Sequence, residues 1–357
     1  MNLELTDEQL ALRDTVRRFL AEKAPISGHV RELLDDPCGT DDAVWQGLAD
    51  LGTTGLLVPE EYGGAGMTMV EAGIVAEELG AALHPGPWLS SAVAATRMLT
   101  RAGGDAAAEL LAGIDDGSTI ATLAPLGEPG ALSATLTGVP DAAAADVLLI
   151  LAEYQDGTGL FAVDKDSAGV SLTFERGVDQ TRKQFRVTLD NADAHLLATP
   201  SPEDIAAVVD DVLIAMAADA LGAATAVMQL AVEYAKTRRQ FGQFIGSFQA
   251  VQHLCVDMYE TVELARSGVI HALWAADAAP NERHLSAVRA KAFAGRLATV
   301  GDTAIQVFGG IGYTWEHDAH LYLKRLLSWS QFLGGPDRYL TELGARLASS
   351  EPTKDFP

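Results

Sequence analysis

The chain is 357 residues long and carries a formal net charge of -24. This length suits two or three closely packed domains with a large core. The excess of acid argues against nonspecific binding to nucleic acid or to an anionic membrane, because both polyanions would be repelled. Hydrophobic residues make up 48% and aromatic residues 6% of the chain, and the many Ala and Leu residues favour packed helices.

The cysteines and the apolar segments bear on cellular location. Cys38 and Cys255 are far apart and lack a CxxC or His-rich context, so neither a disulfide framework nor a structural zinc site is expected. Charges interrupt the opening segment MNLELTDEQLALRDTVRRFLAEKAP, and no later segment is apolar for the ~18 residues that a membrane span needs. We therefore expect a cytoplasmic protein that does not enter a membrane.

The first domain, residues 1–115, is predicted to be helical. Thr6 is a plausible N-cap of an opening amphipathic helix, in which apolar residues recur with helical period: Leu10, Leu12, Val16 and Leu20. A second helix is expected near Asp41 to Leu51, and a third starts near Thr68 after a Gly-rich turn.

The second domain, residues 116–201, has a different texture and is predicted to be a small β domain. Short β-favouring runs separated by Gly, Asp and Pro are Val147 to Leu151, Leu160 to Val163 and Gln184 to Leu189.

The third domain, residues 202–357, returns to a helical pattern that lasts to about Ala348. Gly- and Pro-containing breaks divide it into four or five long helices. These breaks are Gly242 to Gly246, Pro280, Gly309 to Gly312 and Gly334 to Pro336. Helix block, β block and helix block define an α+β, mostly α fold.

Two segments of the third domain carry the most specific patterns. The first, from Tyr234 to Met258, reads YAKTRRQFGQFIGSFQAVQHLCVDM, and the second, from Ala304 to Arg325, reads AIQVFGGIGYTWEHDAHLYLKR. Both resemble motifs of the acyl-CoA dehydrogenase superfamily, and the second is similar to bacterial members associated with the breakdown of steroid and other bulky acyl-CoA thioesters. LTDEQLALRDTVRRFLAEKAP and GLLVPEEYGGAGMTMVEAGIVAEELG resemble the opening domain of the same family.

The resemblance implies a helical N-terminal domain, a middle β-barrel-like domain and a C-terminal four-helix bundle, with FAD at their junction. It implies α,β-desaturation of an acyl-CoA, an electron-transfer flavoprotein as electron acceptor, and assembly into homo- or hetero-oligomers, as dimers or tetramers. The long Ala-rich bundle suits such assembly because it can bury a flat apolar face.

The resemblance also assigns cofactor contacts. Arg238, Phe241 and Gln249 correspond to residues that contact FAD bound largely by the neighbouring subunit. A guanidinium suits a pyrophosphate, an aromatic ring packs on a flat ring, and an amide binds a nucleotide. Taken singly, Arg238 could instead be a solvated helix-end cation and Phe241 a core residue. Gly242 and Gly246 permit a tight turn that would set Ser247 as the cap of the next helix.

The second motif supplies the remaining predicted contacts. By resemblance, Gln306, Gly309 and Gly310 approach the FAD of another subunit, because glycines let backbone amides come close to a phosphate or ribose. A GlyGly loop alone more often only ends a helix. His317 and His320 stand close together, but no third ligand has suitable spacing, so no metal site is predicted.

The catalytic base of the family is not where the pattern expects it. Most relatives place a Glu after the GlyGly loop, where this chain has Leu333 or Gly334, and Asp337 is displaced by a helical turn. Isovaleryl-type relatives place the base on the first long helix of the bundle, at the position of Val212. Asp211 is adjacent, although about 100° around the helix, and Asp219 lies seven residues on, on nearly the same face. These two acids are the candidate bases, and a paired or solvated surface acid is the alternative for each.

The middle domain also departs from the family. LAPLGEPGALSA and GVPDAAAAD replace the usual Thr-Glu-x-x-x-Gly-Ser-Asp and Trp-Ile-Thr-Asn segments, and Gly138 cannot stack on a flavin as the indole would. We therefore predict one half of a heteromeric enzyme, in which a partner chain supplies the base and the flavin pocket. A non-catalytic structural subunit and a flavin-dependent monooxygenase or oxidase are the alternatives.

Overall fold

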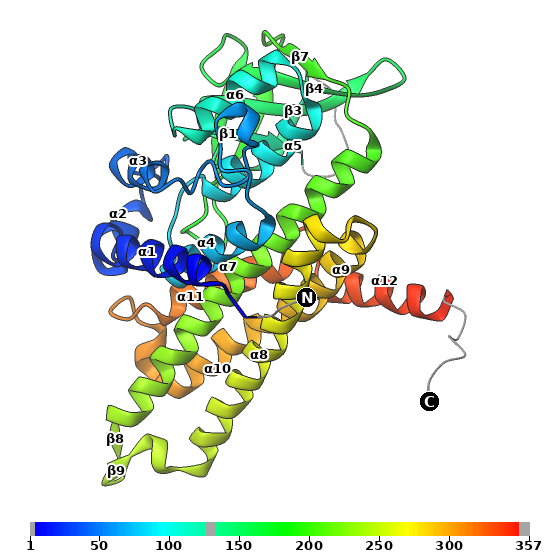
Figure 1. Cartoon of the computed structure of the whole chain (residues 1–357). Helices are drawn as coiled ribbons and strands as arrows, with labels where there is room; N and C mark the ends of the chain where they lie inside the picture. Colours follow the sequence, from blue (N-terminus) through cyan, green and yellow to red (C-terminus); the bar gives the residue numbers. More distant parts are fainter. Residues whose placement is uncertain (1–3, 126–132, 350–357) are drawn as a thin grey trace.

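The computed structural model describes residues 4–125 and 133–349 (Figure 1). Helices occupy both ends of the chain and two small sheets lie between them, so the predicted α+β, mostly α fold is confirmed. The first helices are α1 (Asp7–Lys23), α2 (Arg31–Leu33), α3 (Asp42–Asp50), α4 (Met69–Ala81), α5 (Thr96–Ala102) and α6 (Asp105–Asp115). Thr6 and Thr68 cap α1 and α4, each in a reciprocal capping box with the third residue of its helix.

The middle of the chain forms two sheets rather than a continuous barrel. The strands are β1 (Ala121–Ala124), β2 (Thr135–Pro140), β3 (Val147–Tyr154), β4 (Gly157–Asp164), β5 (Val170–Glu175), β6 (Gln184–Leu189) and β7 (His195–Ala198). One sheet has the order β1-β3-β4-β7 and the other the order β2-β6-β5. β1 pairs with β3 in parallel, and the other pairs in both sheets are antiparallel. Residues 126–132, within the predicted LAPLGEPGALSA departure, lie outside the described residues.

The C-terminal helices form a bundle around one long helix. Their bounds are α7 (Pro202–Thr237), α8 (Gln249–Ala278), α9 (Arg283–Ala294), α10 (Ala298–Phe308), α11 (Ala319–Gln331) and α12 (Pro336–Ser349). A two-stranded hairpin, β8 (Arg239–Gln240) and β9 (Gln243–Phe244), follows α7. Figure 1 shows α7 running from the sheets down to this hairpin, so a single helix joins the β region to the far end of the bundle.

Helices α4 and α7 cross with their backbones in contact, and two glycines make this possible. A Cβ at Gly80 would stand 1.9 Å from the carbonyl oxygen of Asp219, and one at Gly222 would stand 1.8 Å from that of Glu77. Because any side chain at either position would overlap the other helix, these glycines fix the position of Asp219 relative to the N-terminal helices.

Two local predictions are corrected. Asp211, for which a solvated surface acid was the alternative, is fully buried, and its neighbour Asp210 is buried as well, because other helices enclose this part of α7. Ser247 does not cap α8: Phe248 is at the N-cap, and the Ser247 hydroxyl donates to the carbonyl oxygen of Phe244. Among the described residues, no helix has the length and apolar character needed to cross a membrane.

Candidate functional site

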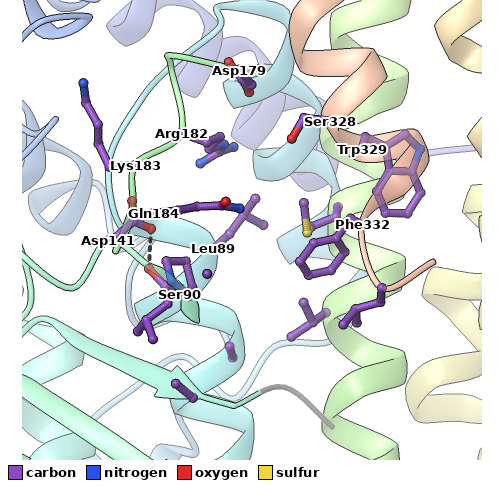
Figure 2. A pocket seen from close by; sticks show the side chains of 18 of the residues that line it. Leu89, Ser90, Asp141, Asp179, Arg182, Lys183, Gln184, Ser328, Trp329 and Phe332 are labelled. Carbon is purple, nitrogen blue, oxygen red and sulfur yellow. Dashed lines mark hydrogen bonds between the residues drawn. The ribbon is translucent and has the colours of Figure 1, made fainter. Parts of the chain in front are cut away.

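A cavity of about 230 Å³ lies where the β region meets α7 and α11. Figure 2 shows Ser90 and Asp141 on one wall and Phe332 on the opposite wall, with Gln184 pointing into the space. Each wall comes from a different part of the chain, because Asp141 follows β2, Gln184 begins β6 and Phe332 follows α11.

A buried network of charges closes one end of the cavity. Asp219 on α7 accepts a hydrogen bond of 2.5 Å from Arg182 and one of 3.3 Å from Arg325. Arg325 also lies 3.4 Å from Asp179 and donates to the hydroxyl of Thr181 and to the carbonyl of His84. Asp219, one of the two predicted bases, therefore lines the cavity, but its carboxylate is already bound by two guanidinium groups.

Asp211, the other predicted base, lies elsewhere. It is fully buried and is not among the residues that line the cavity. Arg97, Arg101 and Arg283 surround it, with nitrogen-to-oxygen distances of 3.3, 3.2 and 3.4 Å. Burial raises the pKa of Asp211, against the effect of these arginines. This arrangement argues against Asp211 as the base and for a role in joining α5, α7 and α9.

The family position of the base does lie at the cavity. Leu333 lines it, directly after α11, and adopts a left-handed backbone conformation with a φ of +52°. Gly334 follows with a φ of +108°, in a turn whose amide donates to the carbonyl of Gln331. An apolar side chain thus stands where the resemblance predicts a carboxylate.

Asp141 is an acid of the cavity wall that sequence patterns did not single out. Its side chain is 4% exposed, and it accepts a hydrogen bond of 2.7 Å from the Ser90 hydroxyl. Burial raises the pKa of Asp141 to about 6, although the Ser90 hydrogen bond and the nearby arginines act in the opposite direction. The segment GVPDAAAAD offered no helical or strand period that would mark this residue, and only tertiary packing brings it to the cavity.

Gly138 brings no side chain to the cavity wall. It lines the cavity with a φ of +66°, and a Cβ there would meet no atom within 4 Å. The position to which the resemblance assigns an indole therefore carries no side chain. Trp329 and Phe332 supply the aromatic surface of the cavity from the opposite side.

The predicted cofactor contacts gather at the far end of α7. Tyr234, one turn before Arg238, packs on Phe308, the last residue before Gly309, with ring centroids 5.1 Å apart. The two sequence motifs therefore meet at the same end of the bundle. Arg238 itself is exposed and forms the C-cap of α7, and Gln249 and Gln306 are exposed on the neighbouring helices.

The side chains of these residues are exposed and can contact a ligand from outside this chain. Phe241 is 90% exposed, and no hydrogen bond or ion pair within the described residues engages the side chains of Arg238, Gln249 or Gln306. A Cβ at Gly309 or Gly310 would meet no atom within 4 Å, so the space beside both residues is open, and the φ of +65° at Gly309 itself favours glycine. A cation, exposed amides and an open glycine loop fit a dinucleotide phosphate and ribose.

The cavity and the exposed contacts are far apart. Arg238 follows Asp219 by nineteen residues on one continuous helix, which is about 28 Å at the α-helical rise per residue. A flavin ring held in another chain could reach these contacts without occupying the cavity of this one.

His317 and His320 do not form part of a metal cluster. His317 accepts a hydrogen bond from the amide of Ala319 and packs on Phe308, and His320 packs edge-on against Trp315. No group of three or more possible metal ligands occurs in the part of the chain that the structure describes.

Comparison with known proteins identifies the family. Residues 6–112 match the model of the acyl-CoA dehydrogenase N-terminal domain, and residues 213–348 match that of the C-terminal domain. Acyl-CoA dehydrogenase IpdE2 of Mycobacterium tuberculosis is 35% identical over 345 residues, which cover 96% of this chain and 98% of the relative. The chain belongs to the acyl-CoA dehydrogenase family, and the resemblance seen in its motifs is confirmed.

Two solved structures are also similar over nearly the whole chain. A variant of the Tcur3481–Tcur3483 steroid ACAD is 30% identical with a TM-score of 0.87, over 96% of this chain and 99% of the other. The ChsE4–ChsE5 complex from Mycobacterium tuberculosis is 25% identical with a TM-score of 0.90, over 98% of this chain and 100% of the other. Both names describe assemblies of two different components.

Proposed function

We propose that this chain is one subunit of a heteromeric, FAD-dependent acyl-CoA dehydrogenase that desaturates an acyl-CoA thioester between its α and β carbons. Electrons would leave through an electron-transfer flavoprotein, and the acyl group would be bulky, such as a steroid side chain. The observation that carries the proposal is the separation of the exposed, unengaged residues around Arg238 from a cavity that has Leu333 in place of the base.

In this proposal, side chains of this chain form part of a cofactor site at the subunit boundary. Arg238 neutralises the pyrophosphate, Phe241 packs on a flat ring, and Gln249 and Gln306 hydrogen-bond to the nucleotide. The amides of Gly309 and Gly310 complete the contact. Bound FAD would supply the acceptor of the hydride, which is chemistry that no amino-acid side chain provides.

The partner chain would supply the base, because the acids of this chain that the sequence suggested are engaged. Asp211 is enclosed by three arginines and Asp219 by two. Exposed Tyr313 and Trp315 beside the glycine loop, at 70% and 57% exposure, offer apolar surface for the partner to cover. Two free thiols, Cys38 and Cys255, suit the reducing cytoplasm.

The test is purification of the tagged chain from its native host, with flavin measured per chain. We expect a second, related chain and fewer than one FAD per copy of this chain. Arg238→Gln in the reconstituted complex should weaken FAD binding about tenfold or more, since one charge-assisted contact is lost.

Arg239→Gln is the matched control, because Arg239 is adjacent in sequence but stacks on Phe244 at 4.1 Å within the hairpin. Its flavin affinity should be close to that of the unaltered chain. Stoichiometric FAD in the isolated chain, together with robust dehydrogenation of an acyl-CoA, would refute the division of labour.

A further inference from the structure

A lysine side chain is fully buried beside the end of α11. Lys291 belongs to α9 and is one of the largest completely buried side chains among the described residues. It forms no ion pair with a carboxylate in the part of the chain that the structure describes, and burial lowers the pKa of Lys291 from 10.5 to about 7. A buried ammonium group without a carboxylate is costly, because water no longer solvates it. An apolar side chain of similar volume would avoid this cost, so packing alone does not account for a lysine at this position.

The ammonium group binds the carbonyl groups that end α11. Lys291 Nζ donates to the carbonyl oxygen of Trp329, and to that of Ser330 at 3.4 Å. The last carbonyls of a helix lack an amide four residues ahead, and the negative end of the helix dipole lies there. Amides of the following turn bind the carbonyls of Ser328, Trp329 and Gln331. The Ser330 carbonyl receives no such amide within the described residues, so Lys291 supplies its hydrogen bond.

Two aromatic rings complete the surroundings of the ammonium group. Lys291 Nζ lies 3.7 Å from the centroid of the Trp329 ring and 5.9 Å from that of Tyr339, which belongs to α12. The face of an aromatic ring attracts a cation, and more strongly where water is excluded. Burial raises the pKa of Tyr339 above its ordinary value of 10, so this phenol stays neutral beside Lys291. Protonated Lys291 therefore binds α11 and α12 at once.

The turn that Lys291 contacts forms a wall of the cavity. Trp329, Phe332 and Leu333 line the cavity, and Figure 2 shows the first two on the side where α11 ends. Leu333 has a φ of +52°, which is uncommon for a residue other than glycine and persists only where surrounding contacts hold it. Its carbonyl oxygen accepts hydrogen bonds of 3.0 and 2.9 Å from two side chains of α12. Lys291 thus holds the turn from the α11 side, and α12 holds it from the other.

Other charged groups near α9 have partners of their own. His284, seven residues before Lys291, binds Asp210 and Glu342, and the hydrogen bond to Asp210 is the largest cause that raises the pKa of His284 to about 9. Charged side chains of the packed helices bind elsewhere: Asp211 binds arginines of α5 and α9, Arg325 binds Asp219, Arg338 binds the Leu333 carbonyl, and His271 lies 3.9 Å from Glu282. The charge at the end of α11 therefore depends on Lys291.

We propose that Lys291 is a positioning residue of the cavity: its charged ammonium group holds the last turn of α11 and so places Phe332 and Leu333 in the cavity wall. Its hydrogen bonds and ring contacts favour the protonated form, so the turn loosens as pH rises through 7. This local effect is separate from the cost of burying the charge, which decreases over the same range. The proposal goes beyond the proposed function, since it requires neither FAD nor a base in this chain.

The first measurement follows the charge beside the tryptophan ring. The full-length chain, with any partner that it retains, is labelled with fluorotryptophan, and the fluorine NMR signal of Trp329, one of five tryptophans, is assigned by its loss in Trp329→Phe. Because Lys291 Nζ lies 3.7 Å from this ring, we expect the signal to shift with a midpoint near pH 7. Lys291→Met, which has a similar volume and no charge, should abolish this shift.

The second measurement follows the turn itself. Hydrogen exchange of residues 328–335, read by mass spectrometry and corrected for the intrinsic rate at each pH, gives the protection of their amides. In the unaltered chain we expect this protection to fall about tenfold between pH 6 and pH 8, because a neutral amine makes weaker hydrogen bonds than an ammonium group. Lys291→Met should show the lower protection at both pH values.

Lys324→Met is the matched control, because Lys324 is a second lysine that lies over a tryptophan, 4.6 Å from the Trp315 ring, but makes no hydrogen bond to the turn within the described residues. Its protection of residues 328–335 should depend on pH as in the unaltered chain.

Three results would overturn the proposal. The first is a Trp329 signal that stays constant between pH 6 and pH 8, or that shifts equally in Lys291→Met. The second is protection of residues 328–335 that does not change with pH in the unaltered chain. The third is an equal loss of protection in Lys324→Met and Lys291→Met. If Lys291→Met does not fold, the two pH profiles of the unaltered chain decide the question, since a lysine needed only for packing would leave both flat.

Discussion

The two ends of α7 use charge in opposite ways. In its buried half, Asp211 and Asp219 are each surrounded by arginines from other helices and loops. At its exposed end, Arg238 has no ion pair within the described residues, and Phe241 projects into solvent. The same helix therefore stabilises the fold at one end and presents binding groups at the other. Substitutions at the buried end should lower stability, and substitutions at the exposed end should change ligand binding instead.

The largest expected effect is at the buried end. Asp219→Asn should lower the free energy of unfolding by about 3 to 5 kcal/mol, because it leaves the buried guanidinium groups of Arg182 and Arg325 without their shared carboxylate. Urea denaturation followed by circular dichroism measures the change.

Arg238→Gln provides the contrast at the exposed end and should alter stability by no more than about 0.5 kcal/mol. A cost below about 1 kcal/mol for Asp219→Asn would mean that the network is not what holds α7 in place. Equal costs for both variants would break the distinction between the two ends.

A smaller effect, of opposite sign, is expected for the cavity acid. Burial raises the pKa of Asp141 to about 6 from an ordinary value of 3.8, so the folded state binds a proton more tightly than the unfolded state. The ionised acid therefore destabilises the fold above pH 6, and this cost disappears as pH falls through 6 toward 4. Asp141→Asn should stabilise the chain at pH 8 by up to about 3 kcal/mol.

Thermal unfolding at pH 8 and at pH 4.5 checks this prediction. The gain should be clear at pH 8 and small at pH 4.5. Destabilisation by Asp141→Asn at pH 8 would instead make Asp141 a structural acid.

The sequence predicted those features that depend on neighbours along the chain. The caps at Thr6 and Thr68 and the breaks between the long helices follow from local hydrogen bonding and from the backbone preferences of Gly and Pro. The motifs around Arg238 and Gly309 were equally readable, because each is a short, contiguous pattern. Their roles at a cofactor stay predictions.

The cavity could not be predicted from local sequence patterns. Asp141 follows β2, Arg182 lies in the loop before β6, and Arg325 belongs to α11, so only the packing of three separate regions brings them together. The acids of α7 were misplaced for a related reason. An Ala-rich helix has no clear polar face, so its period cannot tell a solvated Asp210 or Asp211 from one that faces arginines on other elements.

The smaller of the two pH-dependent effects is expected at the margin of the buried end, where His284 of α9 joins α7 to α12. Its ring nitrogens lie 2.9 Å from Asp210 and 2.8 Å from Glu342, and the side chain is about half exposed. The hydrogen bond to Asp210, more than that to Glu342, raises the pKa of His284 to about 9. Stabilisation by a raised pKa is complete below the unfolded pKa of 6.5 and is lost as pH rises through 9.

Because solvent screens a half-exposed pair, His284→Gln should cost only about 1 kcal/mol at pH 6.5, and its unfolding curve should approach that of the unaltered chain at pH 10. Urea denaturation at the two pH values measures this. The loss in free energy of unfolding should then decrease as exposure increases, from Asp219 through the pair of His284 and Asp210 to Arg238. An equal loss for the His284 and Asp219 variants would show that burial does not determine how much each charged contact stabilises the fold.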